Sequence, residues 1–89
     1  MPKMTSPAPS STLTTSTVTF QWNAGNQEDL YRLHVGTTGS GSKNIRKQNG
    51  FTQTSLTVTG VPINVNTVYV RLWYRTGANW SFIDYAYQT

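Results

Sequence analysis

The side chains that could catalyse a reaction are few in this sequence. Its carboxylates are Glu28, Asp29 and Asp84 besides the terminus, and His34 is the only histidine. Glu28 and Asp29 are adjacent, which is poor geometry for a paired acid and base, and nothing supports a Ser–His–Asp arrangement. The chain has no cysteine, which excludes disulfides, thiolate zinc sites and cysteine nucleophiles. We therefore expect no enzyme activity, no catalytic residue, no cofactor and no metal site.

Large aromatic side chains and arginines gather in residues 68–87. This stretch holds two of the three tryptophans and four of the five tyrosines, together with Arg71 and Arg75. Flat rings stack on sugar rings or nucleobases, and guanidinium groups beside them suit carboxylate or sulfate groups. The alternative is a structural role. The aliphatic parts of arginine side chains often cover tryptophan rings on the outer face of a sheet, or at a contact with a neighbouring domain. Both interpretations stay open at this point.

The apolar residues alternate with a period of two, which predicts strands rather than helices. The alternation runs through "TVTFQW", "LYRLHV" and "SLTVTG", then through two long strands at about 67–76 and 79–88, with a weaker strand near 45–48. These signals predict an all-β fold, a single antiparallel β-sandwich of about seven strands. We expect residues 1–11 to be a Pro/Ser-rich linker or an extended edge segment, and residues 12–89 to form the sandwich module. The predicted core is Val18, Phe20, Trp22, Tyr31, Leu33, Val35, Leu56, Val58, Val70, Leu72, Ile83 and Tyr85.

The last two strands can be registered from the sequence alone. If residues 76–79 form a four-residue hairpin loop, residues whose numbers sum to 155 lie opposite one another. One face is then uncharged and pairs Val68–Tyr87, Val70–Tyr85, Leu72–Ile83 and Tyr74–Ser81. The other pairs Tyr69–Ala86, Arg71–Asp84, Trp73–Phe82 and Arg75–Trp80. A slip of one residue would mix the two faces, so their consistency supports this register.

The order of these segments resembles that of fibronectin type III and immunoglobulin-like sandwiches. "STVTFQW" is similar to the second strand of such a module, "DLYRLHVG" to the third, "TSLTVTGVP" to the strand and turn before the sixth, and "NTVYVRLWYR" to the sixth. The resemblance covers about residues 7–88 and extends to small modules of secreted bacterial enzymes and surface proteins. These often end in a pattern like Trp80, Asp84, Tyr85 and Tyr87 here. The resemblance implies an accessory module at an extracellular or cell-surface location. A type III module usually turns a tyrosine inward at the start of its sixth strand, whereas our register turns Val68 inward and Tyr69 outward.

The predicted site is the outward face of the sheet that holds the third, sixth and seventh strands, which usually share one sheet. We expect His34 to be a surface or interface residue and Arg71 to face Asp84. If the face binds carbohydrate, Trp73 and Trp80 should be exposed and coplanar. A second basic cluster consists of Lys43, Arg46 and Lys47. We interpret it as a group of charges on an edge strand that opposes pairing of that edge with another chain. The candidate ligand-binding residues are Arg32, His34, Tyr69, Arg71, Trp73, Arg75, Trp80 and Phe82.

The charge balance favours an anionic partner without choosing one. Seven Lys and Arg against three acidic residues give a net charge of +4, a field that attracts polyanions. Three hypotheses follow. The first is a carbohydrate-binding accessory module, with an acidic polysaccharide as one candidate ligand, and the second is a spacer or protein–protein module that packs on neighbouring domains. The third, the least favoured, is a basic nucleic-acid binder. The sequence has no run of about 18 apolar residues, so we expect no membrane-spanning segment. We expect the isolated module to be monomeric.

Overall fold

The computed structural model describes residues 2–8, 10–23, 28–64 and 67–89, without the side chains of 28–29 and 49–51. These residues form seven strands and no helix. The predicted all-β fold with antiparallel sheets is therefore confirmed for the described chain. No helix in this part is long and apolar enough to cross a membrane. The strands are β1 (Met4–Ser6), β2 (Val18–Trp22), β3 (Glu28–Gly36), β4 (Arg46–Phe51), β5 (Ser55–Val58), β6 (Thr67–Thr76) and β7 (Asn79–Gln88).

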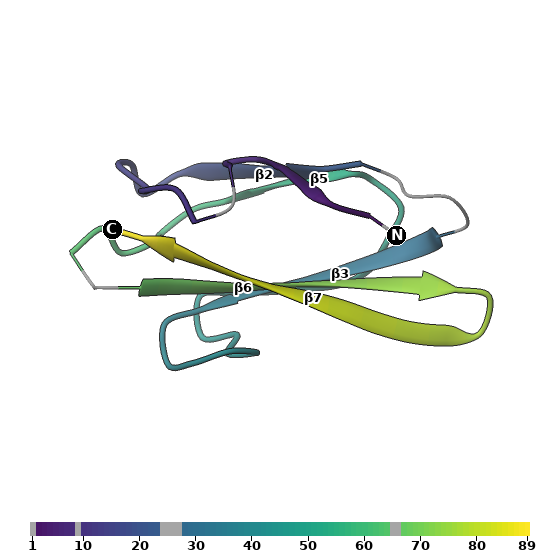
Figure 1. The fold of residues 1–89 in the computed structure, drawn as a ribbon. Coiled ribbons are helices and arrows are strands. Elements are labelled where there is room, and N and C mark those ends of the chain that lie inside the picture. The colour runs from purple at the N-terminus through teal and green to yellow at the C-terminus, as the bar shows by residue number, and fades with distance from the viewer. Residues whose placement is uncertain (1, 9, 24–27, 65–66) are drawn as a thin grey trace.

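The strands form two antiparallel sheets that lie one over the other in two layers (Figure 1). The smaller sheet has the order β1-β2-β5 and the larger one β4-β3-β6-β7. The expectation that β3, β6 and β7 share a sheet is confirmed. β4, the strand with the basic residues, lies at one edge of the larger sheet, as predicted, and β7 lies at the other.

The core lies between the sheets because alternate residues of each strand turn inward. In β2, Val18, Phe20 and Trp22 are buried while Thr19 and Gln21 are exposed. Two edge-to-face ring pairs join the layers: Phe20 packs on Tyr87 of β7 and Trp22 on Tyr31 of β3, each with centroids 5.8 Å apart. Such contacts add to the free energy that burial of the rings already contributes. The buried hydrophobic residues are Met4, Leu13, Val18, Phe20, Trp22, Tyr31, Leu33, Val35, Val58, Val61, Val68, Val70, Leu72 and Tyr87.

The predicted core differs from this set at its margins. Leu56 and Tyr85 are only partly buried, although both pack against the core. Ile83 is also only partly buried, so its assignment to the core was wrong. It lies on the edge strand of the wider sheet, towards the hairpin end, where the smaller sheet covers it incompletely. Met4, Leu13 and Val61 are core residues that the alternation did not identify, because they lie in short or irregular segments.

The hairpin of β6 and β7 has the predicted register. All ten pairs, from Thr67–Gln88 to Thr76–Asn79, have residue numbers that sum to 155. The loop is tighter than expected, because Thr76 and Asn79 still pair and leave only Gly77 and Ala78 as the turn. Gly77 has a φ of +63°, which a type II′ hairpin turn requires at its first central position and which glycine adopts without strain.

The N-terminal segment closes one end of the sandwich. β1 pairs with β2 at the edge of the smaller sheet, and Met4 is buried in the core. The Met4 N–H donates to the Tyr85 hydroxyl oxygen (3.0 Å), and the Tyr87 hydroxyl donates to the Pro7 carbonyl (3.0 Å). β1 and the residue that follows it are therefore tied to the C-terminal half of β7 across the two layers.

Candidate functional site: the outer face of the larger sheet

Backbone pairing across β3, β6 and β7 brings all the predicted site residues to one surface. Directly paired residues point to the same side of a sheet, so each row across the three strands shares a face. We call the eight predicted residues (Arg32, His34, Tyr69, Arg71, Trp73, Arg75, Trp80 and Phe82) the aromatic–arginine face. The rows are Gly36–Tyr69–Ala86, His34–Arg71–Asp84, Arg32–Trp73–Phe82 and Leu30–Arg75–Trp80.

Trp73 lies at the centre of this face. Its ring contacts Phe82, with centroids 4.9 Å apart and planes inclined at 55°. Its indole Nε1–H donates to His34 Nδ1 at 3.2 Å, which requires that nitrogen to be unprotonated. The His34 ring meets Trp73 edge to face, with centroids 6.1 Å apart. These contacts on two sides fix the orientation of the indole.

Arg71 joins the ring cluster to a carboxylate. Its Nε and Nη2 donate to the two oxygens of Asp84 at 2.6 and 2.9 Å, which forms the predicted ion pair in bidentate geometry. The side-chain hydrogen bond to Asp84 raises the pKa of the Arg71 guanidinium, so this group stays charged. The guanidinium carbon also lies 3.8 Å from the Phe82 ring centroid, a cation–π distance. Asp84 thus already occupies the Arg71 fork that could bind an external carboxylate.

Arg32 and Trp80 form a second stacked pair. The Arg32 guanidinium reaches across β6, and its carbon lies 3.9 Å from the Trp80 ring centroid. Arg32 Nε is buried without a hydrogen-bond partner. One face of Trp80 is therefore covered by a cation. The stack adds a fixed positive charge to the face.

The exposure of the rings differs from the prediction. Trp73 and Trp80 are both half-buried, because His34, Phe82 and Arg32 lie against them. The full exposure that carbohydrate binding predicts for these two rings is therefore not found. Phe82 is 45% exposed and is the most accessible ring of the group.

His34 is another correction. It turns to the outer side of its strand, as predicted, but it is only 9% exposed and not a surface residue. Trp73 lies against it, and the loop between β3 and β4 folds beneath the larger sheet (Figure 1). A Cβ placed on Gly41 of this loop would meet Arg71 Nη1 at 2.8 Å, so the loop lies against the Arg71 side chain. Arg71 pairs with His34, and the loop therefore lies near His34 as well.

The loop between β3 and β4 holds its position through its own contacts. Thr37 N–H donates to Asn44 Oδ1 at 3.0 Å, and Asn44 Nδ2 donates to Thr37 Oγ1 at 3.1 Å. A Cβ on Gly36 would collide with Ser42 and Asn44, so only glycine allows the chain to turn back there. The sequence identified this segment as a loop by its glycines, but that signal did not indicate which surface it would cover.

Lys47 lies beside the aromatic–arginine face on the same side of the sheet, whereas the sequence predicted it only as part of an edge cluster. It pairs with His34 and so extends the row His34–Arg71–Asp84 onto β4. Lys47 is exposed and makes no ion pair within the described chain. The alternation of β4 could have located it, but that strand is short and its apolar residues are too few to fix its register.

The remaining predicted residues lie at the margins of the face. Tyr69 is half-buried and lies two residues along β6 from Arg71, in the row of Gly36 and Ala86. Arg75 is half-buried and lies opposite Trp80 at the hairpin end. The centre of the face therefore consists of Trp73, Phe82 and the two stacked arginines.

The carboxylate described on this face is already paired. Asp84 is engaged by Arg71, and the side chains of Glu28 and Asp29 lie outside the described part of the chain. Within the described part of the chain, no three His, Cys, Asp or Glu side chains come close enough to hold a metal ion. The chemistry that this face offers is stacking on rings and attraction of anions.

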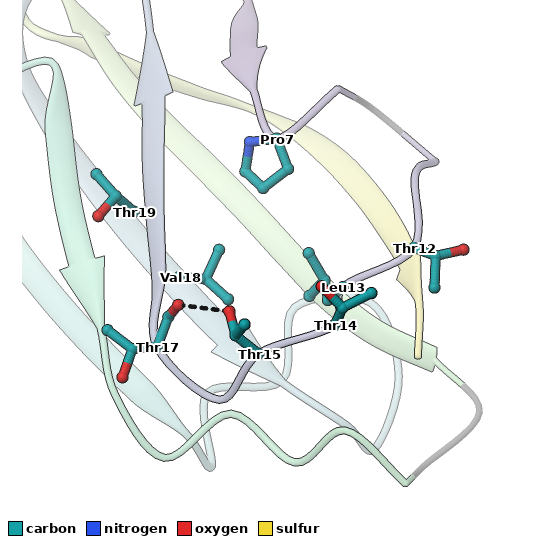
Figure 2. A pocket seen from close by; sticks show the side chains of 8 residues that line it. All are labelled: Pro7, Thr12, Leu13, Thr14, Thr15, Thr17, Val18 and Thr19. Carbon is teal, nitrogen blue, oxygen red and sulfur yellow. Dashed lines mark hydrogen bonds between the residues drawn. The ribbon is translucent and has the colours of Figure 1, made fainter.

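A pocket of about 260 Å³ lies in a different part of the molecule. It lies between Pro7, the segment 12–15 and the start of β2, and most of its lining residues are threonines (Figure 2). The Thr15 hydroxyl donates to the Thr17 carbonyl at 2.9 Å. None of its lining residues is ionisable, so it offers hydroxyl groups and apolar surface but no acid or base. The lining residues are Pro7, Thr12, Leu13, Thr14, Thr15, Thr17, Val18 and Thr19.

Comparison of the chain with protein-family models, curated proteins and solved structures found no significant match. The fold and the geometry of the aromatic–arginine face therefore carry the functional argument.

Proposed function

We propose that this chain is a non-catalytic accessory module that binds carbohydrate through the aromatic–arginine face. The observation that carries the proposal is the cluster of Trp73, Phe82 and Trp80, which the two strands β6 and β7 assemble on one outer face with a 45% exposed ring near its centre. An accessible ring is a surface against which the C–H bonds of a sugar can stack.

An acidic polysaccharide is the ligand class that the charges favour. Arg32 and Lys47 both lie on this side of the larger sheet, and within the described chain neither forms an ion pair. The net charge of +4 attracts polyanions over a longer range. The tilt of 55° between Trp73 and Phe82 suits a single glycan chain with rotated sugar rings better than a flat crystalline surface.

We assign the module to the fibronectin type III or immunoglobulin-like sandwiches, and to a secreted or surface protein. The division of strands supports this assignment. β3, β6 and β7 share a sheet, β4 is added beside β3, and β1, β2 and β5 form the other sheet. In such sandwiches the third, sixth and seventh strands form one sheet, which an extra strand beside the third can extend.

A second candidate is a spacer that packs this face against a neighbouring domain. The occupied fork of Arg71 favours it, because an ion pair completed within the module leaves less charge for a ligand. Both candidates use the same surface, and they differ in whether an isolated module binds glycans.

The test is affinity electrophoresis of the folded module in gels that contain polygalacturonate, alginate or a neutral glucan. Phe82→Ala should weaken binding to an acidic glycan on the order of tenfold or more, because a stacked ring contributes about 1–3 kcal/mol. Ile63→Ala is the matched control, since Ile63 is also an exposed apolar residue (47%) but lies in the loop before β6. It should bind as the wild type does.

Two results would contradict the proposal. If the wild type migrates unretarded in every glycan, the spacer function is favoured instead. If it binds DNA or RNA with a steep loss of affinity in salt and no glycan, the third hypothesis replaces the proposal.

A further inference from the structure

The free edge of β7 is the longest strand edge in the described structure that carries no exposed cation. β7 spans ten residues at the margin of the larger sheet (Figure 1). It pairs with β6 on one side, and on the other side its residue Gln88 forms a bridge with Thr12. A strand edge presents unpaired N–H and C=O groups that can pair with another chain. Which residues of β7 present these groups follows from the hydrogen bonds at its C-terminal end.

Gln88 fixes the direction in which the backbone groups point. Its N–H donates to the Ser11 carbonyl at 3.1 Å, and its carbonyl accepts from Leu13 N–H at 2.8 Å. Both groups of Gln88 therefore point away from β6, and the segment 11–13 already adds to this edge in the parallel direction. The register between β6 and β7 has no bulge.

In an antiparallel ladder, alternate residues of a strand bond to the same side. The residues at even distance from Gln88 must also point outward: Trp80, Phe82, Asp84 and Ala86. Each of these four presents one N–H and one C=O at the open edge, and the residues between them bond to β6. The segment 11–13 bonds only to the end of the strand, so among the described residues the edge from Trp80 to Ala86 has no partner.

The four edges of the two sheets differ in how they are protected. β1 has three residues and β5 has four, and short edges offer little to a partner. β4 carries the exposed Arg46 and Lys47, and edge cations oppose strand addition. In β7, the charged residue Asp84 is bound by Arg71.

We propose that the β7 edge pairs antiparallel with the β7 edge of a second copy of this chain. A two-fold axis at Ile83 sets Trp80 opposite Ala86 of the copy and Phe82 opposite Asp84 of the copy. All eight outward backbone groups then find partners, and the two larger sheets become one continuous sheet of eight strands.

The side chains fit this self-pairing. Ile83 is half-buried on the inner side of the strand and meets its own copy at the axis, which removes apolar surface from water. The exposed Phe82 ring lies beside the Asp84–Arg71 pair of the copy. A register that set Asp84 opposite Asp84 would oppose like charges, so the axis at Ile83 is favoured over that one.

A β4–β4 pairing would bring Arg46 and Lys47 against their copies. A β4–β7 pairing would join unlike edges and continue into an open chain of molecules, whereas the β7–β7 pairing closes as a dimer. The inference departs from the sequence-based expectation of a monomer, and it does not depend on whether the aromatic–arginine face binds a glycan.

The experiment is amide hydrogen exchange by NMR, with sedimentation equilibrium at the same concentrations from micromolar to millimolar. At the lowest concentration, the amides of Trp80, Phe82, Asp84 and Ala86 should exchange fast while that of Ile83 is protected by β6. At the highest, the chain should dimerise and the four fast amides should become protected. Ala86→Pro removes an N–H that bonds to nothing in the single chain, so it should keep the fold by circular dichroism and weaken the dimer severalfold or more.

Three outcomes overturn the proposal. The first is a chain that stays monomeric at all concentrations, even if an extended peptide of another protein later protects the same four amides. The second is a dimer that forms without added protection at these positions. The third is a dimer in which folded Ala86→Pro associates as strongly as the wild type. If Ala86→Pro does not fold, the exchange pattern of the wild type alone decides.

Discussion

The two halves of β7 share one alternating pattern and have different surroundings. In the C-terminal half, residues 85–88, Tyr87 is fully buried, packs its ring on Phe20 and donates its hydroxyl proton to Pro7. Tyr85 accepts a hydrogen bond from Met4 N–H. Both inward tyrosines are therefore held by β1 or by the residue that follows it.

In the N-terminal half, residues 79–84, the inward positions are not closed in this way. Ser81 is exposed and Ile83 is only half-buried. The outward positions carry Trp80 and Phe82 with their stacked arginines. This half therefore has apolar side chains on a surface that water reaches, and it also has most of the open backbone edge.

The difference comes from the neighbouring segments and not from the strand itself. β1 is only three residues long, and its hydrogen bond to β7 goes to Tyr85 in the C-terminal half. The C-terminal half thus contributes its apolar side chains to the core. The N-terminal half keeps apolar surface that remains exposed to solvent after folding. Apolar surface of this kind is available for binding a ligand or a second chain.

The largest expected effect is a difference in stability between two variants, each of which lacks one ring of β7. Tyr87→Ala removes a fully buried ring and should lower the free energy of unfolding by about 3–5 kcal/mol. Phe82→Ala removes a ring of similar size from the N-terminal half, where it is 45% exposed, and should cost less than about 1 kcal/mol. Urea unfolding of both variants measures the contrast. Equal losses would mean that the two halves do not differ as described.

A smaller effect is expected at alkaline pH. Burial raises the pKa of Tyr87 well above the usual value, and the charge of Tyr85 adds to the shift. Below about pH 10 both the folded and the unfolded chain keep this proton. Above it the unfolded chain loses the proton first, so this residue's contribution to stability is lost as pH rises, by about 1.4 kcal/mol per unit.

Tyr87→Phe isolates this effect because it removes the ionisable group and keeps the ring. Near neutral pH the variant should be less stable by about 1 kcal/mol, since it lacks the hydrogen bond to Pro7. The gap to the wild type should shrink as pH rises above about 10. Tyr69→Phe, on the outer face, is the control. A gap that stays constant between neutral and alkaline pH would show that Tyr87 is not buried in its neutral form.

The sequence was sufficient to predict the elements whose alternation is long and regular. The bounds of β6 and β7, their register, and the division of residues between core face and outer face follow from a period of two over ten residues. The Arg71–Asp84 pair follows from the same register. These features are local, so a short stretch of sequence contains all that determines them.

What the sequence could not predict depends on contacts between distant segments. Met4 is in the core because β1 pairs with β2, a strand further along the chain, at the edge of the smaller sheet. His34 is buried because Trp73 and a glycine-rich loop lie near it. Ile83 follows the same alternation as Leu72, yet its burial depends on how far the smaller sheet extends. Exposure of the face was therefore predicted less well than its composition.

The most direct test of the binding face uses the three tryptophans of the chain as reporters in one experiment. Trp22 is buried in the core, whereas Trp73 and Trp80 lie on the aromatic–arginine face. Indole N–H resonances of ¹⁵N-labelled protein are followed while oligogalacturonate is added. The account predicts that the signals of Trp73 and Trp80 shift in a saturable way while that of Trp22 stays in place. Signals that stay in place for all three indoles, or a shift of Trp22 as large as the others, would contradict it.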